Sequence, residues 1–357
     1  MTFRIGGEFE IASAFLAEQM YCVDPSLPKK YVARLATGRS ALQMALQEII
    51  QRGGKRKAWL PAYICSSVVS VFQRMGYELN YYSVGNSLVG QKFPELVKNE
   101  ETFLYAHYFG KKNHAAIEWL NQVDSKNFYV IEDCVQASLN SNIGNVGNYA
   151  ITSYRKFLSQ PDGAFLGADS VITTPLEDPD EAFVSTKVIG KLLRYQANDD
   201  ELYLSLFANA EKRLEQDFMA RKMSSFSEFL MARTNLPAIS SRRRQNWLTF
   251  SRLIEDGSCA YYGLTPIYKE LDTGEVPLGL PIRISNGRRD ALRRYLAEKH
   301  IYCPIHWDLP HLYGSNEWLE EKDLSQSILT LPIDQRLGEE ELNYMFQMIK
   351  LFLESYK

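Results

Sequence analysis

Apolar and polar positions in the first half of the chain follow two alternating spacings. Between residues 41 and 50 the apolar side chains recur three and four positions apart, which predicts a helix that begins near Gly38 and ends at Gly53. Two further helical patterns and four short apolar runs follow, the helices at 66–75 and 114–123 and the strands at 57–61, 77–84, 101–110 and 127–133. Continuous apolar strands between helices are typical of a parallel sheet covered on both faces, so we expect an α/β fold.

The pattern changes in the second half of the chain. Residues 180–255 form long helical segments rich in charge, which we interpret as connecting helices. Beyond them, strand patterns at 278–285, 300–307 and 328–333 alternate with helical patterns at 288–299 and 339–352. We therefore predict a large domain over residues 1–250 and a smaller α/β domain over residues 251–357.

Composition excludes several classes of protein. Apolar residues make up 45% of the chain and charged residues 23%, with a net charge of -3, which argues against a nucleic acid partner. The five cysteines are scattered without paired spacing, so we expect neither disulfides nor a metal site, and a reducing cytoplasm fits best. Glu8 and Glu10 do not fit a signal peptide, and no apolar run reaches the ~18 residues of a membrane helix, so we expect a soluble protein without a membrane partner.

Two candidate sites follow predicted strands, where the ligands of open parallel sheets gather. The turn Thr37-Gly38-Arg39-Ser40 opens a helix whose free amides suit a phosphate, although glycine before a helix is common without a ligand. Asp133 ends a buried strand. Its carboxylate could cap a helix, the more frequent role, or face a cationic ligand nitrogen.

A third candidate is Lys156, in the segment SYRKFLSQPDGAF. A lysine amine is protonated at neutral pH, so one that attacks a carbonyl must be buried or lie near another cation. Arg155 and the turn at 161–163 are compatible with this, although most lysines in such segments are surface residues. In chain order, a phosphate-type helix start, an acid and a lysine are the three anchors that pyridoxal phosphate requires.

These segments resemble a known family, the DegT/DnrJ/StrS nucleotide-sugar aminotransferases. ATGRSALQMAL looks like the family's phosphate loop, VIEDCVQAS is similar to its acidic segment, and Lys156 with residues 162–164 has its spacing from lysine to acid-glycine-glycine. The resemblance runs from about residue 35 to the C-terminus. It implies a fold type I transferase that depends on pyridoxal phosphate, with a mostly parallel seven-stranded sheet between helices and a smaller α/β domain.

The resemblance also implies residue roles. Lys156 would hold the cofactor as an internal aldimine and shuttle a proton, while Asp133 would keep the pyridine nitrogen protonated. Gln136 would lie near the ring's 3-oxygen, and Tyr63 or Cys65 would cover the ring. Backbone amides of the helix start would bind the phosphate, with a serine hydroxyl as an added donor. The predicted cofactor site is Gly38, Arg39, Ser40, Tyr63, Cys65, Asp133, Gln136, Ser153 and Lys156.

The chain departs from the family pattern in three places. Ser153 stands three residues before the lysine, where the family usually has five, and Ala164 replaces the second glycine, which a turn tolerates if its φ is negative. The N-terminal segment GGEFEI, residues 6–11, has no counterpart from which a role follows.

Three further groups have two interpretations each. His107 could point into the site, but a hydrogen-bonded structural role is more frequent for a histidine at a strand end. His306 and Trp307 could lie at the cofactor entrance or pack between the domains. The run Arg242-Arg243-Arg244 could meet a diphosphate, although such a run is more often a solvated helix face.

The predicted function is transfer of an amino group from a donor, expected to be glutamate, to a keto group of a nucleotide-linked sugar. The resemblance implies a homodimer. Two alternatives remain open, a non-catalytic binding or scaffold protein that keeps the fold and a pyridoxal phosphate enzyme that acts on another substrate.

Overall fold

A seven-stranded sheet forms the centre of the larger domain in the computed structural model, which describes residues 3–12, 21, 27–88, 91–196 and 200–355. The strand order is β2-β8-β7-β6-β5-β3-β4. The strands are β2 (Tyr31–Leu35), β3 (Lys57–Pro61), β4 (Glu78–Tyr82), β5 (Thr102–Ala106), β6 (Tyr129–Asp133), β7 (Tyr149–Ile151) and β8 (Ala164–Ala168). Only β8 runs against its neighbours, β7 and β2, so the predicted mostly parallel sheet is confirmed.

Three helices pack on this sheet in the first half of the chain. They are α1 (Gly38–Gln51), α2 (Ser66–Arg74) and α3 (His114–Gln122), close to the bounds that the apolar spacing predicts. In α1 the apolar stripe from Ala41 to Ile49 is buried against the sheet. The side chain of Thr37 accepts a hydrogen bond from the Ser40 amide at 3.1 Å and thereby begins the helix.

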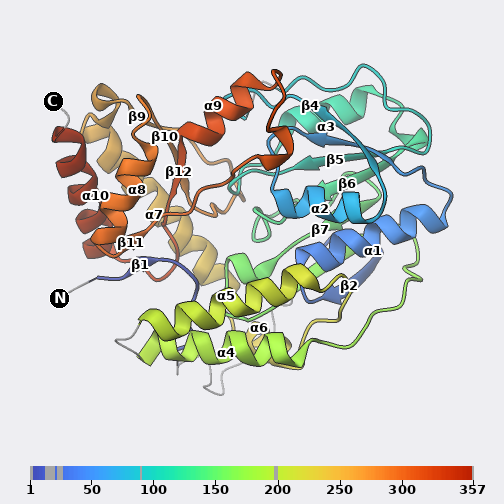
Figure 1. Cartoon of the computed structure of the whole chain (residues 1–357), viewed down its shortest axis with the longest axis horizontal. Helices are drawn as coiled ribbons and strands as arrows, with labels where there is room; N and C mark the ends of the chain where they lie inside the picture. Colours follow the sequence, from blue (N-terminus) through green and yellow to red (C-terminus); the bar gives the residue numbers. More distant parts are fainter. Residues whose placement is uncertain (1–2, 13–20, 22–26, 89–90, 197–199, 356–357) are drawn as a thin grey trace.

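Four helices occupy the region predicted to connect the domains. They are α4 (Glu181–Gln196), α5 (Asp200–Gln216), α6 (Ser225–Ala232) and α7 (Leu236–Asp256). Figure 1 shows α4 and α5 side by side below the sheet, while α7 runs up into the smaller domain. Among the described residues, no helix combines the length and the apolar character needed to cross a membrane.

The smaller domain is built on a three-stranded antiparallel sheet. Its order is β12-β10-β9, with β9 (Leu264–Pro266), β10 (Leu280–Ile284) and β12 (Ile328–Leu331), and α8 (Arg289–Glu298), α9 (Leu319–Ser327) and α10 (Glu339–Glu354) accompany it. A parallel pair of two-residue strands, β1 (Ile5–Gly6) and β11 (Ile301–Tyr302), completes it. The boundary predicted at residue 250 lies inside α7, because Trp247, Phe250 and Ile254 belong to the smaller domain's core.

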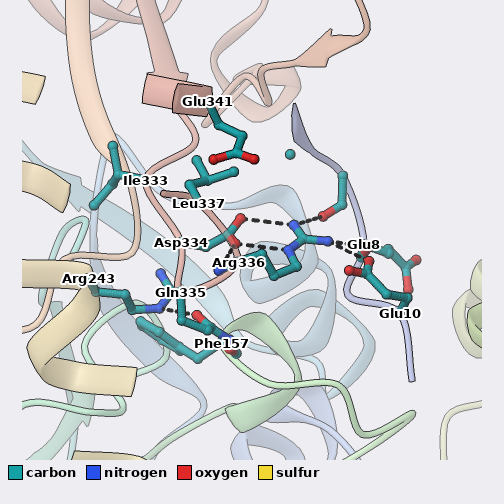
Figure 2. A network of polar contacts seen from close by, with 12 residues as sticks. Glu8, Glu10, Phe157, Arg243, Ile333, Asp334, Gln335, Arg336, Leu337 and Glu341 are labelled. Atoms are coloured by element: carbon teal, nitrogen blue, oxygen red, sulfur yellow. Dashed lines mark hydrogen bonds and ion pairs between the residues drawn. The ribbon is translucent and has the colours of Figure 1, made fainter. Parts of the chain in front are cut away.

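The N-terminal GGEFEI segment links the two domains through ion pairs. The guanidinium of Arg336, in the smaller domain, donates from Nε and Nη2 to Asp334 at 2.9 Å each and from Nη1 to Glu10 at 2.8 Å, as Figure 2 shows. On the other side, Glu8 forms an ion pair with Lys187 of α4 at 2.5 Å. A segment without an assigned role in the sequence is therefore a structural connection.

We expect Arg336→Leu to lower the free energy of unfolding by about 2–4 kcal/mol, because it leaves the buried Asp334 carboxylate without its cation. Urea unfolding measures the change. The control is Arg283→Leu, which breaks the exposed pair with Asp323 and should cost no more than about 1 kcal/mol. Equal losses in the two variants would contradict the structural role of Arg336.

Candidate active site

A cavity of about 340 Å³ lies at the carboxyl ends of the strands β3, β5, β6 and β7. Residues just after these strands line it, as expected for an open parallel sheet. It brings together residues that are far apart in the sequence. The predicted site residues on its wall are Gly38, Arg39, Cys65, Asp133, Gln136, Ser153 and Lys156.

A tight turn positions Lys156. The residue ends a 3-10 turn, Tyr154–Lys156, and the Tyr154 amide donates to the Gly163 carbonyl at 2.9 Å. Gly163 has a φ of +123°, which favours glycine, whereas Ala164 begins β8 outside the left-handed region. The buried Asp162 accepts a hydrogen bond from the Ser224 hydroxyl at 2.8 Å, which ties the turn to the start of α6. The replacement of the second glycine is therefore tolerated as expected.

The surroundings of Lys156 favour a neutral amine. Burial lowers the pKa of the Lys156 amine, the nearby Cys65 and Asp133 oppose that shift, and Arg155 with Arg39 adds to it. Arg155 thus lowers the pKa of the Lys156 amine, as the sequence led us to expect. A lysine with a lowered pKa has a larger fraction in the nucleophilic form at neutral pH.

Asp133 ends β6 and is buried at the cavity wall. Its Oδ1 accepts a hydrogen bond from the Val135 amide at 2.9 Å. Burial raises the pKa of its carboxyl group, while the hydrogen bond from the Val135 amide and the nearby Lys156 and His107 side chains lower it. The carboxylate therefore faces the cavity from a site where a further cationic partner would stabilise its charge.

His107 has a structural role. Its Nε2 is 2.8 Å from Oε1 of the buried Glu132, and its Nδ1 accepts the Asn113 amide at 2.9 Å. Both ring nitrogens are thus engaged by the protein, which fixes the tautomer as Nε2–H. This agrees with the interpretation favoured from the sequence, although His107 is also among the residues that line the cavity.

Gln136 presents a hydrogen-bond donor that no described residue accepts. Its Oε1 accepts the Phe109 amide at 2.8 Å, which orients the side chain. Its Nε2 is buried and has no hydrogen-bond partner within the described residues. Because an unpaired buried donor costs about 1–3 kcal/mol, this nitrogen is suited to a ligand acceptor.

The helix start at Gly38 differs in one respect from the predicted phosphate site. The Ser40 amide already donates to Thr37, and Ser40 lines a different cavity from the one that the other predicted site residues line. The amides of Gly38 and Arg39 lie in the first turn, where a helix offers no internal acceptor. A Cβ at Gly38 would approach Val135 Cγ2 to 3.2 Å, which favours glycine at this position.

Positive charge gathers behind this helix start. Glu211 of α5 lies 2.8 Å from Arg155, 2.9 Å from Lys187 and 3.5 Å from Arg39. Although burial raises the pKa of Glu211, these cations lower it overall, so the group stays ionised. Burial also lowers the pKa of Lys191 to about 8. Four cations face two carboxylates here, the cations Arg39, Arg155, Lys187 and Lys191 and the acids Glu8 and Glu211.

Of the two residues predicted to cover a ring, only Cys65 lines the cavity. Tyr63 is fully buried behind it, with its ring centroid 5.6 Å from that of Trp307 and 6.0 Å from that of Tyr108. The Tyr63 hydroxyl donates to the His306 carbonyl. Trp307 itself lies on the cavity wall, so the smaller domain contributes a flat side chain to the cavity lining.

Lys156 also lines a second cavity of about 560 Å³ between the domains. The N-terminal segment, β12 and the residues after β11 contribute to it, together with His306 and Arg243. Burial and the charge of Lys156 lower the pKa of His306 to about 3, and its Nδ1 is 2.9 Å from the Thr330 hydroxyl. The amine thus stands between a small cavity at the sheet and a larger one at the domain interface.

No family model and no curated protein sequence matches the chain. Solved structures do match. PseC of Helicobacter pylori, an aminotransferase involved in the biosynthesis of pseudoaminic acid, has a TM-score of 0.66 at 13% identity over 99% of this chain and 100% of that one. NtdA of Bacillus subtilis, with bound cofactor PMP, has a TM-score of 0.66 at 13% identity over 91% of this chain and 74% of that one.

A DegT DnrJ EryC1 StrS aminotransferase of Brucella abortus also matches, with a TM-score of 0.59 at 17% identity over 91% of this chain and 87% of that one. These likenesses establish the fold. The chain shares the fold of these aminotransferase structures, and the fold expected from the sequence is confirmed.

We expect the acid sensitivity of the fold to depend on His306. Its pKa is about 3 in the folded chain and about 6.5 when unfolded, so between these values the unfolded chain binds a proton that the folded chain does not. Stability should therefore fall as the pH is lowered from 6.5 towards 3. Urea unfolding at pH 7 and pH 5 should give a loss that is about 1–2 kcal/mol smaller in His306→Asn than in the wild type. Identical losses in both proteins would contradict the assignment.

Proposed function

We propose that this protein is an aminotransferase that depends on pyridoxal phosphate. The observation that carries the proposal is one cavity lined by Lys156, by the buried Asp133 and by Gln136, whose Nε2 has no hydrogen-bond partner among the described residues. The fold supports it, since the similar structure of NtdA binds PMP.

The residues present fit the cofactor. Gln136 Nε2 offers a buried donor for the 3-oxygen of the ring, and Asp133 offers a carboxylate for the protonated pyridine nitrogen. The free amides of Gly38 and Arg39, with the Ser153 hydroxyl nearby, suit a phosphate. The cations Arg39 and Arg155 beside Glu211 would also attract a phosphate dianion.

When bound, the cofactor supplies a sink for the electrons of the substrate carbon that loses its proton. The chain supplies the rest. Lys156 would hold the cofactor until the amino donor displaces it. The released neutral amine would then take a proton from the substrate carbon and give it to the cofactor carbon on the other side of the transferred nitrogen. Asp133 keeps the nitrogen proton in place, and Trp307 on the wall helps to exclude water.

For the substrates, we propose glutamate as the amino donor and a keto group of a nucleotide-linked sugar as the acceptor. The larger cavity beside Lys156 supports a substrate of this size, since ligand sites of about 300–1,000 Å³ hold drug-sized molecules. PseC, whose name places it in the biosynthesis of pseudoaminic acid, is consistent with a sugar. The four described cysteines are free, which is consistent with the proposed cytoplasmic location.

We expect the purified protein to gain a visible absorption band with pyridoxal phosphate, and Lys156→Ala to lose it together with at least about a 1,000-fold drop in the half-reaction with glutamate. Absorption spectroscopy and stopped-flow kinetics measure both. The control is Lys98→Ala, which changes an exposed lysine remote from the cavity and should leave both readouts unchanged. A wild type that stays colourless and inactive would favour the non-catalytic alternative.

We also propose a homodimer. Large apolar side chains of α4 and α5 are exposed in the single chain, which is consistent with a surface that a partner covers. They are Ile189, Leu192, Tyr195, Leu202 and Leu204.

Light scattering on the purified protein should give twice the mass of one chain at micromolar concentration. A monomer under these conditions would contradict the proposed assembly, although the chemistry proposed for Lys156 would stand.

A further inference from the structure

Arg243 is a buried cation on the wall of the larger cavity. It comes from α7, near the middle of the arginine run that the sequence singles out, and only 1% of its surface is exposed. The same cavity includes Lys156. The interpretation of the whole run as a solvated face is thus wrong for this arginine, while Arg242 is exposed as expected.

The contacts of Arg243 hold the guanidinium without neutralising it. Its Nε donates to Gln335 Oε1 at 2.8 Å, as Figure 2 shows, and its Nη1 donates to the carbonyls of Pro277 at 3.1 Å and Leu278 at 3.0 Å. The Phe157 ring lies 4.9 Å from its Cζ. Within the described residues, Nη2 has no hydrogen-bond partner and no carboxylate forms an ion pair with Arg243. The group is therefore oriented by the protein and has one free nitrogen.

The acids of the same cavity are paired with other cations. Asp334 is bound at 2.9 Å through each of its two oxygens by Arg336, and Glu8 is bound by Lys187 at 2.5 Å. Burial lowers the pKa of Arg243 to about 10, and the charge of Asp334 only partly opposes this. A buried charge without a partner is costly, so the site would be stabilised by an anion.

We propose that Arg243 binds a negatively charged group of the substrate, a carboxylate or a phosphate, through its free Nη2 while the substrate reacts at Lys156. Two further arginines of α8, Arg293 and Arg294, lie on the same cavity wall and add positive charge towards its rim. Since the Nε and Nη1 atoms are occupied, the contact is made by one nitrogen and not by the two-pronged fork typical of arginine. The identity of this anion as a substrate group rests on the proposed function.

The test is isothermal titration calorimetry on the protein loaded with pyridoxal phosphate, with glutarate in one arm and inorganic phosphate in the other. Arg243→Gln should weaken binding about 10- to 100-fold in at least one arm, because a hydrogen bond to a charged group is lost. A loss for glutarate alone identifies the donor carboxylate, and a loss for phosphate alone identifies a phosphate of the acceptor. Arg243→Lys should recover part of the affinity, since it restores the charge.

The matched control is Arg244→Gln. Arg244 is adjacent and also donates to backbone carbonyls, those of Asp272 and Glu275, but it does not line the cavity. It should leave both affinities unchanged. The proposal is overturned if neither anion binds the wild type, or if Arg243→Gln binds both as tightly as the wild type does.

Two further measurements separate other outcomes. The visible band of the loaded protein should persist in Arg243→Gln. If the wild type itself shows no band, the proposed function fails, and this result is distinct from a failure of the anion site. If Arg243→Gln does not fold, crystals of the wild type grown with glutarate or phosphate decide. An anion within hydrogen-bond distance of Arg243 Nη2 supports the proposal, and anions bound only elsewhere overturn it.

Discussion

Buried cations lie on both sides of Lys156, and the need to pair them constrains the rest of the structure. On the side of the sheet, Glu211 forms ion pairs with Arg39, Arg155 and Lys187. On the side of the smaller domain, Arg243 has only neutral partners. Burying charge in a medium of low polarity is tolerated only when counter-charges are near, so the proposed anionic ligands would complete the arrangement.

The N-terminal segment and the helical pair of α4 and α5 make this arrangement possible. Glu8 reaches Lys187 and Lys191, while Glu10 reaches Arg194 and Arg336. These contacts connect the inner face of α4 to the smaller domain across the larger cavity. The acids that could neutralise Arg243 are thereby held by other cations, and the two domains are joined near the amine that both cavities share.

Much of the fold followed from local patterns. The spacing of apolar residues placed α1, α2 and α3 and the strands β3 to β6, because each buries a continuous face. The strands β2, β7 and β8 were not predicted. Of these, β7 has only three residues, and β2 lies at the edge of the sheet, where every second residue is more exposed. The helix α9 was also missed, because its sequence is largely polar and its burial depends on the smaller domain.

The sequence by itself determined the chemistry that the local chain can hold, namely Asp133 at the end of a strand, Gln136 three residues later and Lys156 before a glycine turn. These spacings can be recognised in the sequence because a strand end and a tight turn are local structures. Only the tertiary structure decided that Ser40 and Tyr63 lie off the cavity wall and that Trp307 and Arg243 lie on a wall beside the amine. Burial and hydrogen bonding join residues that are far apart in the sequence, such as Arg243 and Gln335, which are 92 positions apart, and no local pattern encodes these contacts.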